Sequence, residues 1–541
     1  AGRRGPHVGG PAQRAWRWAA GAVRTPAAAL ALVIAACVGL RVWVLTSAIG
    51  RLNADEAVTG VMAQRILGGE WFTYYPPQPY MGALEQYLQA GVLAVLPDGP
   101  LTLRLVQVAL SGLTCGLTYG LGRRVTGSAW AGVLAAALFA LGPFHSVVWG
   151  TRSLGAYLAA QAVGVIGALI ALGLEPSGRR AVPAVAGFGL CLGLGLWLNV
   201  SAFFMLIPAA VWLAGSMRGH VRRLLPWTAL GAAVGVLPFL VFQVRHGFAD
   251  WTGYPQPPSS VLDRLHGLVD PLLGMFLGVR QPYSGQAEAG TGMAWLVTVA
   301  ALAGLAAALW VRRRGLLDLV LLRPGGRRRP LDVVLVALVL AGLGYVASSY
   351  GWFTGEPRYL FAVYPALAVA LAAAVHRTGR LAPAVGATAL ALTVLLFAIS
   401  ADRDLKAGGG GGFVDGVRVE PTALGRVAEA MRRAGIRSVY ADYWLAYPLQ
   451  FAAGDRLQVA ATTYVRFPDA VAAAKRDPSP AFAAPVGLPA DRIAAALERR
   501  GARYTRQDVE GIAVFSRVRP RQRPQDLGVW PPWGWGYSPP G

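Results

Sequence analysis

The chain is a succession of apolar blocks separated by short polar segments. Each block is about twenty residues long, the length at which a helix crosses the hydrocarbon core of a bilayer. The blocks cover residues 26–49, 101–121, 129–148, 154–174, 182–198, 202–216, 224–244, 293–311, 331–349, 359–375 and 381–400. This pattern predicts a polytopic α-helical membrane protein with about eleven transmembrane helices, and an odd number places the two ends on opposite sides.

The polar segments alternate in charge. One set contains Arg123 and Arg124, Arg179 and Arg180, Arg218, Arg222 and Arg223, Arg312 to Arg314, Arg327 to Arg329, Arg377 and Arg380. The other set contains Asp55, Glu56, Glu70, Glu85, Asp98, Asp250, Asp263, Asp270, Glu288 and Glu356, with few arginines. Arginine-rich loops stay on the cytoplasmic side. We therefore expect a cytoplasmic N-terminus and an extracytoplasmic C-terminal region.

Composition supports this interpretation. Hydrophobic residues make up 55% of the chain and charged residues only 14%, whereas about a quarter of a soluble protein is charged. The net charge of +23 comes from arginines in loops, so it indicates membrane orientation rather than nucleic-acid binding, and membrane lipids are the expected surroundings. Cys37, Cys115 and Cys191 lie in apolar blocks and are expected to be buried and unpaired.

The polar and glycine-rich stretches divide the chain into five parts. Residues 1–25 are expected to be a disordered, basic cytoplasmic tail, and residues 26–400 a transmembrane domain. Residues 401–419 form a linker that contains the glycines 408–412. A small extracytoplasmic α/β domain is predicted at 420–518, and a disordered tail at 519–541. The domain's predicted helices are 421–434 and 490–500, and its predicted strands are 437–441, 457–461 and 511–517.

The first outer segment, residues 50–100, is longer than a connection requires. Residues 54–67 and 81–96 have the apolar spacing of helices, and we expect both to lie at the membrane interface above a cavity. A second long outer segment, 245–290, contains a short amphipathic stretch at 261–277. The acidic pair Asp55 and Glu56 directly follows the first span, where two adjacent carboxylates indicate function rather than structure.

Several short stretches resemble one family. They are Leu-Asn-Ala-Asp-Glu-Ala at 52–57, Gln-Pro-Tyr-Met-Gly-Ala-Leu-Glu-Gln-Tyr at 78–87, Leu-Thr-Leu-Arg-Leu at 101–105, Gly-Thr-Arg at 150–152 and Glu-Pro-Arg-Tyr-Leu-Phe-Ala-Val-Tyr-Pro at 356–365. Together they resemble GT-C glycosyltransferases that use polyprenyl-phosphate sugars, in particular the family-39-like group related to protein O-mannosyltransferases and lipid A aminoarabinose transferases. The resemblance covers residues 27–400. It implies an inverting transfer of a sugar from a polyprenyl-phosphate donor to an acceptor hydroxyl outside the cytoplasm.

Within that resemblance, the acids take candidate roles. Asp55 is the candidate general base, because a carboxylate within reach of the acceptor hydroxyl can accept its proton; the alternative is an N-cap of the following helix. Glu56 could orient the acceptor, hold a divalent cation (Mg²⁺ or Mn²⁺) jointly with Asp55, or simply be solvated. Glu85 could face the same cavity or the exposed side of its helix. The need for a metal stays open.

The candidate cations are Arg152 and Arg358, because a guanidinium can grip two oxygens of the lipid phosphate. The alternative for each is an ion pair with Glu356 or another outer acid. Arg41 and Arg104 are expected to be structural and to reach the lipid headgroups. The remaining candidate substrate contacts are Gln78, Tyr80, His246 and Tyr283.

Two other classes of protein share this pattern. A multi-span transporter or a flippase for lipid-linked saccharides would also have many spans, although no repeat of two matching halves is seen. A non-catalytic assembly or sensor protein would use the α/β domain to bind a partner. The Ala-, Gly- and Arg-rich composition favours the plasma membrane of a bacterium. The acceptor, whether protein, lipid or cell-wall glycan, is not specified by these residues.

Overall fold

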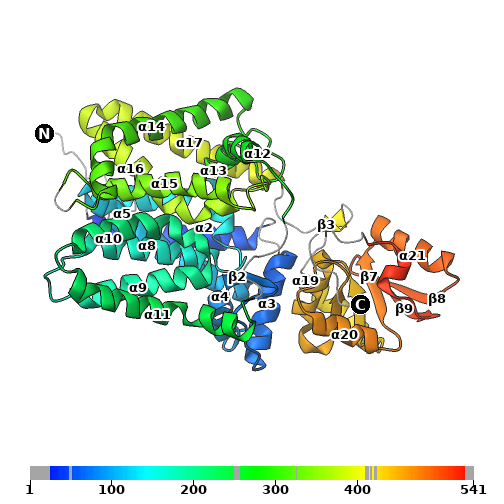
Figure 1. The fold of residues 1–541 in the computed structure, drawn as a ribbon. Helices are drawn as coiled ribbons and strands as arrows, with labels where there is room; N and C mark the ends of the chain where they lie inside the picture. The colour runs from blue at the N-terminus through cyan, green and yellow to red at the C-terminus, as the bar shows by residue number, and fades with distance from the viewer. Residues whose placement is uncertain are drawn as a thin grey trace, which may run out of the picture.

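A computed structural model describes residues 25–47, 52–248, 256–323, 326–407, 413–414, 417–418 and 423–530. It shows a bundle of long helices beside a small α/β domain (Figure 1). Residues 1–24 of the tail predicted at 1–25, and the predicted glycine hinge at 408–412, lie outside the described residues.

The helix bundle matches the predicted blocks one by one. Among the described residues, nine helical segments are long and apolar enough to cross a membrane, and Ala129–Leu141 and Tyr157–Gly173 are shorter apolar helices. The bundle consists of α2 (Pro26–Thr46), α5 (Pro100–Thr126), α6 (Ala129–Leu141), α7 (Phe144–Trp149), α8 (Tyr157–Gly173), α9 (Ala181–Leu198), η2 (Val200–Ala202), α10 (Phe203–Met217), α11 (Val221–Arg245), α14 (Thr291–Val320), α15 (Pro330–Ala347), η4 (Arg358–Val363), α16 (Tyr364–Leu381) and α17 (Pro383–Ala407). The protein is therefore a multi-pass membrane protein.

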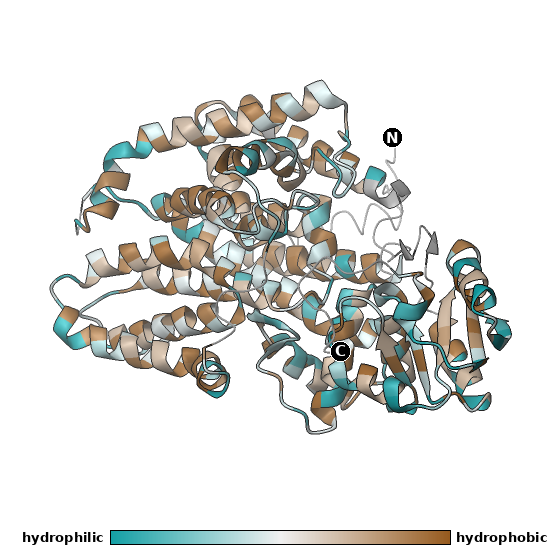
Figure 2. Cartoon of the chain, turned by 45° about the vertical axis from the view of Figure 1, so that its right-hand side comes forward, coloured by the Kyte–Doolittle hydropathy of each residue, from teal (hydrophilic) through white to brown (hydrophobic). Residues whose placement is uncertain are grey.

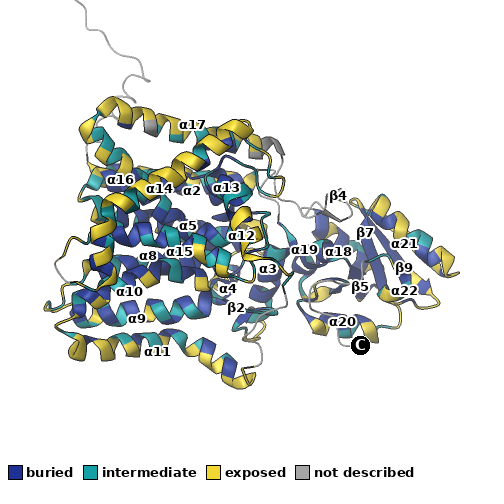
Figure 3. Ribbon diagram, turned by 45° about the horizontal axis from the view of Figure 1, so that its top comes forward, coloured by how far each residue is buried: buried dark blue, intermediate teal, exposed yellow. Residues whose placement is uncertain are grey.

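The outer surface of the bundle is apolar. The bundle helices are mostly brown in the hydropathy view, and much of α11, α14 and α17 is exposed (Figures 2 and 3). On α14, for example, Leu296 and Val299 are exposed. Exposed apolar surface of this extent fits contact with lipid rather than water.

Helices α9 and α11 approach each other through glycines. A Cβ atom at Gly189 would lie 2.0 Å from the carbonyl oxygen of Thr228, and one at Gly231 would lie 1.9 Å from that of Ala186. No larger residue fits at such distances, and small residues are what allow membrane helices to pack backbone against backbone. These glycines therefore fix the helix pair that forms one side of the bundle.

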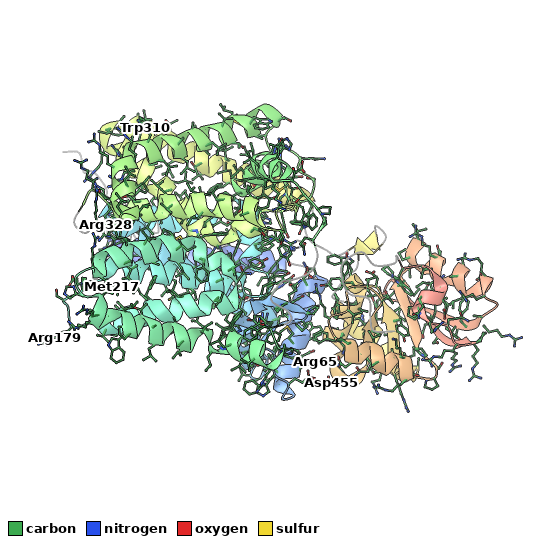
Figure 4. The ribbon with its side chains drawn as sticks, in the orientation of Figure 1. Arg65, Arg179, Met217, Trp310, Arg328 and Asp455 are labelled. Atoms are coloured by element: carbon green, nitrogen blue, oxygen red, sulfur yellow. The ribbon has the colours of Figure 1, made fainter. Side chains whose placement is uncertain are left out.

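The first outer segment folds as predicted into helices. It contains α3 (Ala54–Leu67), β1 (Tyr74–Tyr75), β2 (Gln78–Gly82) and α4 (Leu84–Leu93), and the second outer segment contains α12 (Val261–Gly267), η3 (Leu268–Leu272) and α13 (Leu273–Phe276). In Figure 4, Arg179 and Arg328 lie at the end of the bundle that is remote from the α/β domain, whereas Arg65 of α3 lies next to that domain. The arginine-rich loops that contain Arg179 and Arg328 and the acidic first outer segment thus occupy opposite ends of the bundle.

The C-terminal domain is a five-stranded mixed sheet with helices. Its strands are ordered β6-β5-β7-β9-β8, with β5 parallel to both β6 and β7. Its elements are α18 (Leu424–Arg433), β5 (Ser438–Ala441), α19 (Tyr443–Ala453), η6 (Gly454–Arg456), β6 (Gln458–Ala461), α20 (Pro468–Arg476), β7 (Ala481–Pro485), α21 (Leu488–Arg499), β8 (Arg503–Val509), β9 (Ile512–Arg519) and α22 (Pro524–Leu527), preceded by the short strands β3 (Phe413–Val414) and β4 (Val417–Arg418).

All five predicted elements of this domain are present, and α19, α20, β7 and β8 were not predicted. The expected start of a disordered tail at 519 is wrong. Residues 520–530 include α22, and Trp530 stacks on Phe482 of the sheet. Residues 531–541 lie outside the described residues.

The C-terminal domain docks on α3. The Phe451 ring lies so close to Gly60 that a Cβ atom there would be 2.6 Å from it. The Gln64 amide donates to the Phe451 carbonyl at 3.1 Å, and Arg65 pairs with Asp469 at 2.7 Å. The helix that carries the acidic pair therefore lies between the membrane bundle and the soluble domain.

Candidate active site

A cavity of about 760 Å³ opens where the bundle, the first outer segment and the C-terminal domain meet. Six predicted site residues line it, namely Asp55, Gln78, Tyr80, Arg152, Tyr283 and Arg358. They come from segments spread over some three hundred positions of sequence, so the fold brings together most of the residues that sequence patterns had singled out.

Asp55 is the second residue of α3 and does not cap it. The N-cap is Asn53, whose side chain accepts a hydrogen bond from the Glu56 amide at 2.9 Å. The half-buried Asp55 side chain lines the cavity. Its Oδ1 accepts a hydrogen bond from the Tyr443 hydroxyl, and the Tyr75 hydroxyl donates to its backbone carbonyl at 3.2 Å. The capping alternative for Asp55 is therefore wrong, and the carboxylate is held at the cavity wall.

Glu56 points the other way, into the protein. It is fully buried, and Arg104 donates to both of its oxygens, from Nε at 2.7 Å and from Nη2 at 2.6 Å. The Ser153 amide adds a third hydrogen bond at 3.3 Å. Arg104 is buried too, so its expected position at the headgroups is wrong. Arg41, also expected at the headgroups, is 1% exposed.

These contacts bear on the proposed metal site. Because both Glu56 oxygens are occupied by Arg104, Glu56 and Asp55 do not offer a joint set of ligands. Among the residues that the structure describes, no group of three or more His, Cys, Asp or Glu side chains could hold a metal ion. The residues present thus do not fit a divalent cation held by Asp55 and Glu56, nor a direct contact between Glu56 and the acceptor.

Two further candidates lie away from the cavity wall. Glu85 is buried, where its oxygens accept hydrogen bonds from the Ala159 amide at 2.9 Å and from Gln107 at 3.1 Å. Burial raises the pKa of Glu85 to about 7, although these hydrogen bonds oppose the rise. His246 is exposed at the end of α11, where it stacks on Phe242, and it is not among the described residues that line the cavity.

Arg358 forms the ion pair with Glu356 that was its alternative prediction, and it also lines the cavity. Its Nη2 forms an ion pair with Glu356, which also accepts a hydrogen bond from the Trp149 indole at 2.9 Å. Burial by itself raises the pKa of Glu356, but the charge of Arg358, together with His145 and the hydrogen bonds from Tyr283 and Trp149, brings the pKa below its ordinary value. The guanidinium also lies 4.4 Å from the Phe353 ring centre. Glu356 and the ring hold Arg358 in place beside the cavity.

The C-terminal domain contributes two residues that sequence patterns did not reveal. Tyr443 follows strand β5, and burial together with Asp55 raises the pKa of its hydroxyl well above the ordinary value, so it remains a donor. Arg466 lines the cavity, with its guanidinium 5.2 Å from the Tyr75 ring and 5.5 Å from the Tyr443 ring. Neither residue belongs to a recognisable motif, and only the packing of the two domains identifies them.

No protein-family model matches this chain, and no curated protein matches it by sequence. Solved structures match it well in shape, however, and they show that the chain has the fold of the GT-C membrane glycosyltransferases. The crystal structure of ArnT from Cupriavidus metallidurans bound to undecaprenyl phosphate superposes with a TM-score of 0.58 and 14% sequence identity, covering 91% of this chain and 98% of that one. Its apo form gives 0.58 and 13%, covering 94% and 100%.

A more distant match is the oligosaccharyltransferase from Archaeoglobus fulgidus in complex with Zn and sulfate. It has a TM-score of 0.51 and 12% identity, covering 90% of this chain and 72% of that one. The resemblance predicted from short sequence stretches is thus confirmed at the level of the fold. At these identities the likeness extends to architecture alone.

Proposed function

We propose that the protein is an integral-membrane, inverting glycosyltransferase that moves a sugar from a polyprenyl-phosphate donor to an acceptor hydroxyl. The observation that carries the proposal is the cavity, whose wall presents a carboxylate, Asp55, together with the guanidinium groups of Arg152 and Arg358. A base and a phosphate-binding cation are the two groups that this reaction requires. The ArnT structure, which shares the fold, was solved with undecaprenyl phosphate bound.

In the proposed reaction, Asp55 accepts the proton of the acceptor hydroxyl as its oxygen attacks the anomeric carbon. The bond between that carbon and the phosphate oxygen breaks, and its electron pair leaves with the polyprenyl phosphate. A positioned base typically contributes about 10²–10⁴-fold to such a step. Attack from the face opposite the phosphate inverts the anomeric configuration, as the family resemblance implies.

Arg358 and Arg152 would donate to the oxygens of the departing phosphate. Donors fixed before the reaction stabilise developing charge without reorganisation, and the loss of one typically costs about 10²–10³-fold. Glu356 and Phe353 fix the Arg358 guanidinium. Its buried Nε makes no hydrogen bond to any described residue. No step of this mechanism runs through a metal ion.

The reaction would take place on the extracytoplasmic side of a bacterial plasma membrane. Supporting this orientation, Arg179 and Arg328 lie at the opposite end of the bundle from the C-terminal domain, against which the cavity is built (Figure 4). Because arginine-rich loops stay in the cytoplasm, the acceptor would be a protein, lipid or cell-wall glycan outside it.

The test is an assay of purified protein with a panel of radiolabelled polyprenyl-phosphate sugars and a cell-envelope extract as the source of acceptor. Transfer of label to the extract, or its release by hydrolysis, is expected for at least one donor. A transporter or flippase would instead move an intact donor across liposomes without breaking the sugar–phosphate bond, and an assembly or sensor protein would do neither.

A further inference from the structure

Arg466 places a guanidinium group in the wall of the cavity. No carboxylate among the described residues forms an ion pair with it, and its buried Nε has no hydrogen-bond partner. One terminal nitrogen donates to the Pro76 carbonyl at the long distance of 3.4 Å. By contrast, Arg104 and Arg358 each have a carboxylate. The charge of Asp55 and the hydroxyl of Tyr443 stabilise the Arg466 cation, but no carboxylate neutralises it in an ion pair, so the guanidinium can still bind an anion that enters the cavity.

Its place in the fold is that of a ligand-binding residue. Arg466 follows the carboxyl end of strand β6, and Tyr443 follows the carboxyl end of the neighbouring parallel strand β5. In α/β sheets, ligands bind in the crevice outside the carboxyl ends of the strands. This edge of the C-terminal sheet faces the cavity, because Arg466 lines it and Tyr443 reaches Asp55.

A side pocket of about 280 Å³ adjoins this point and has Arg466 and Arg358 in its wall. The rest of its described lining is rich in aromatic rings, including Tyr80, Trp352 and Tyr464, and contains no acidic residue. Sugar rings present flat C–H faces that pack against aromatic rings. A pocket that combines such rings with the Arg466 guanidinium therefore suits a saccharide that carries negative charge.

We propose that Arg466 and this aromatic side pocket form the acceptor subsite, and that the acceptor is an anionic saccharide with a carboxylate or phosphate near the hydroxyl that receives the sugar. The assignment to the acceptor rests on the proposed function, in which Asp55 is the base. Arg466 lies against Tyr75 and Tyr443, the two tyrosines that bond to Asp55. The anion held there thus lies beside the base, where the acceptor must bind, while Arg152 and Arg358 remain for the donor phosphate.

The experiment compares two probes that differ in one group. p-Nitrophenyl β-glucuronide has a carboxylate where p-nitrophenyl β-glucoside has a hydroxymethyl group, and their binding to the purified full chain in detergent is measured by equilibrium dialysis. Undecaprenyl phosphate serves as the donor-side probe. The variants are Arg466→Gln, Arg466→Lys as the charge-retaining control, and Arg358→Gln as the donor-side comparison.

The wild type is expected to bind the glucuronide about ten-fold tighter than the glucoside, since a hydrogen bond to a charged group is worth about that much. Arg466→Gln should bring the two to equal affinity, while glucoside binding and undecaprenyl phosphate binding change less than about two-fold. Arg466→Lys should retain part of the preference. Unchanged glucoside binding also reports that the variant is folded.

Two results would overturn the proposal. One is equal affinity of the two probes for the wild type, including no binding of either. The other is a loss of undecaprenyl phosphate binding in Arg466→Gln as large as the loss of glucuronide binding, which would assign Arg466 to the donor. The experiment measures binding and not turnover. If the proposed transferase activity fails, these affinities are unaffected, so that failure can be told apart from a failure of the acceptor-subsite proposal.

Discussion

Two polar regions meet at helix α3 and differ in how their charges are satisfied. Beneath the helix lies a buried network of Glu56, Arg104, Glu85 and Gln107, in which each carboxylate has at least two hydrogen-bond donors. On the other side, Asp55 and Arg466 line the open cavity without an ion pair to each other or to any other described residue. Glu56 is therefore buried in an ion pair, whereas its neighbour Asp55 on the same helix faces the cavity.

This difference separates charged side chains that stabilise the fold from charged side chains that are available to a substrate. A buried carboxylate whose oxygens are all occupied cannot accept a proton from a substrate, whereas a carboxylate at a cavity wall with one oxygen free can. We therefore expect substitutions in the buried network to change folding stability, and substitutions at the cavity wall to change catalysis.

The largest effect should come from Arg104→Met, which leaves the Glu56 carboxylate buried without its partner. Breaking such a pair typically costs about 3–5 kcal/mol, and we expect this loss in the unfolding free energy of the detergent-solubilised protein. The double variant Glu56→Gln with Arg104→Met should recover most of it, since no buried charge remains and glutamine can still accept the hydrogen bond that the Asn53 amide donates to the Glu56 side chain. Full stability of the single variant would show that the network is not structural.

At the cavity wall, Arg358→Gln should lower the transfer rate about 10²–10³-fold, because a donor to the departing phosphate is lost. The matched control is Arg179→Gln at the opposite end of the bundle, which should leave the rate unchanged. Equal rates for the two variants would remove Arg358 from the phosphate site.

The pH dependence of folding stability tests the buried network further. The pKa of Glu85 rises from 4.5 to about 7 on folding, so between these values the folded state keeps a proton that the unfolded state has released. Stability therefore falls as pH rises through that window, by roughly 3 kcal/mol in total. Glu85→Gln should be more stable than the wild type by about that amount at pH 8 and equally stable near pH 4.5. If the unfolding free energies of the two proteins change with pH in the same way across this range, the account is contradicted.

A smaller catalytic effect is expected for Tyr443→Phe, which removes only the hydroxyl that donates to Asp55. If Tyr443 positions the base, kcat should fall about ten- to hundred-fold, the value of a hydrogen bond to a charged group, with the KM for the donor little changed. Tyr440→Phe, in the preceding strand β5, is the control. A rise in kcat would show instead that Tyr443 occupies the place of the acceptor hydroxyl.

Sequence patterns predicted the architecture because the apolar blocks alone determine where helices can cross the membrane. They also predicted the place of Asp55, since it follows the first span directly. They did not predict that Glu56 is buried in an ion pair, because its partner Arg104 lies 48 residues away in sequence. Hydrophobic periodicity carries no information about such pairing.

The site residues of the C-terminal domain could not be predicted from the sequence for the same reason. Tyr443 lies 388 residues from Asp55 in sequence, in a helix that the pattern did not predict. His246 shows the opposite error. It is a polar residue at the outer end of a span, a place that suggests function, yet its ring stacks on Phe242 of its own helix.

The most direct test of the central claim compares Asp55→Asn with Asp98→Asn in the same transfer assay. Asp98 is exposed, belongs to the same outer segment and bonds only to Gln64 among the described contacts. Asn at 55 keeps the shape of the side chain but cannot accept the proton, so we predict a loss of about 10²–10⁴-fold with undecaprenyl phosphate binding retained, and wild-type activity for Asp98→Asn. An Asp55→Asn enzyme that transfers sugar at the wild-type rate would contradict the account.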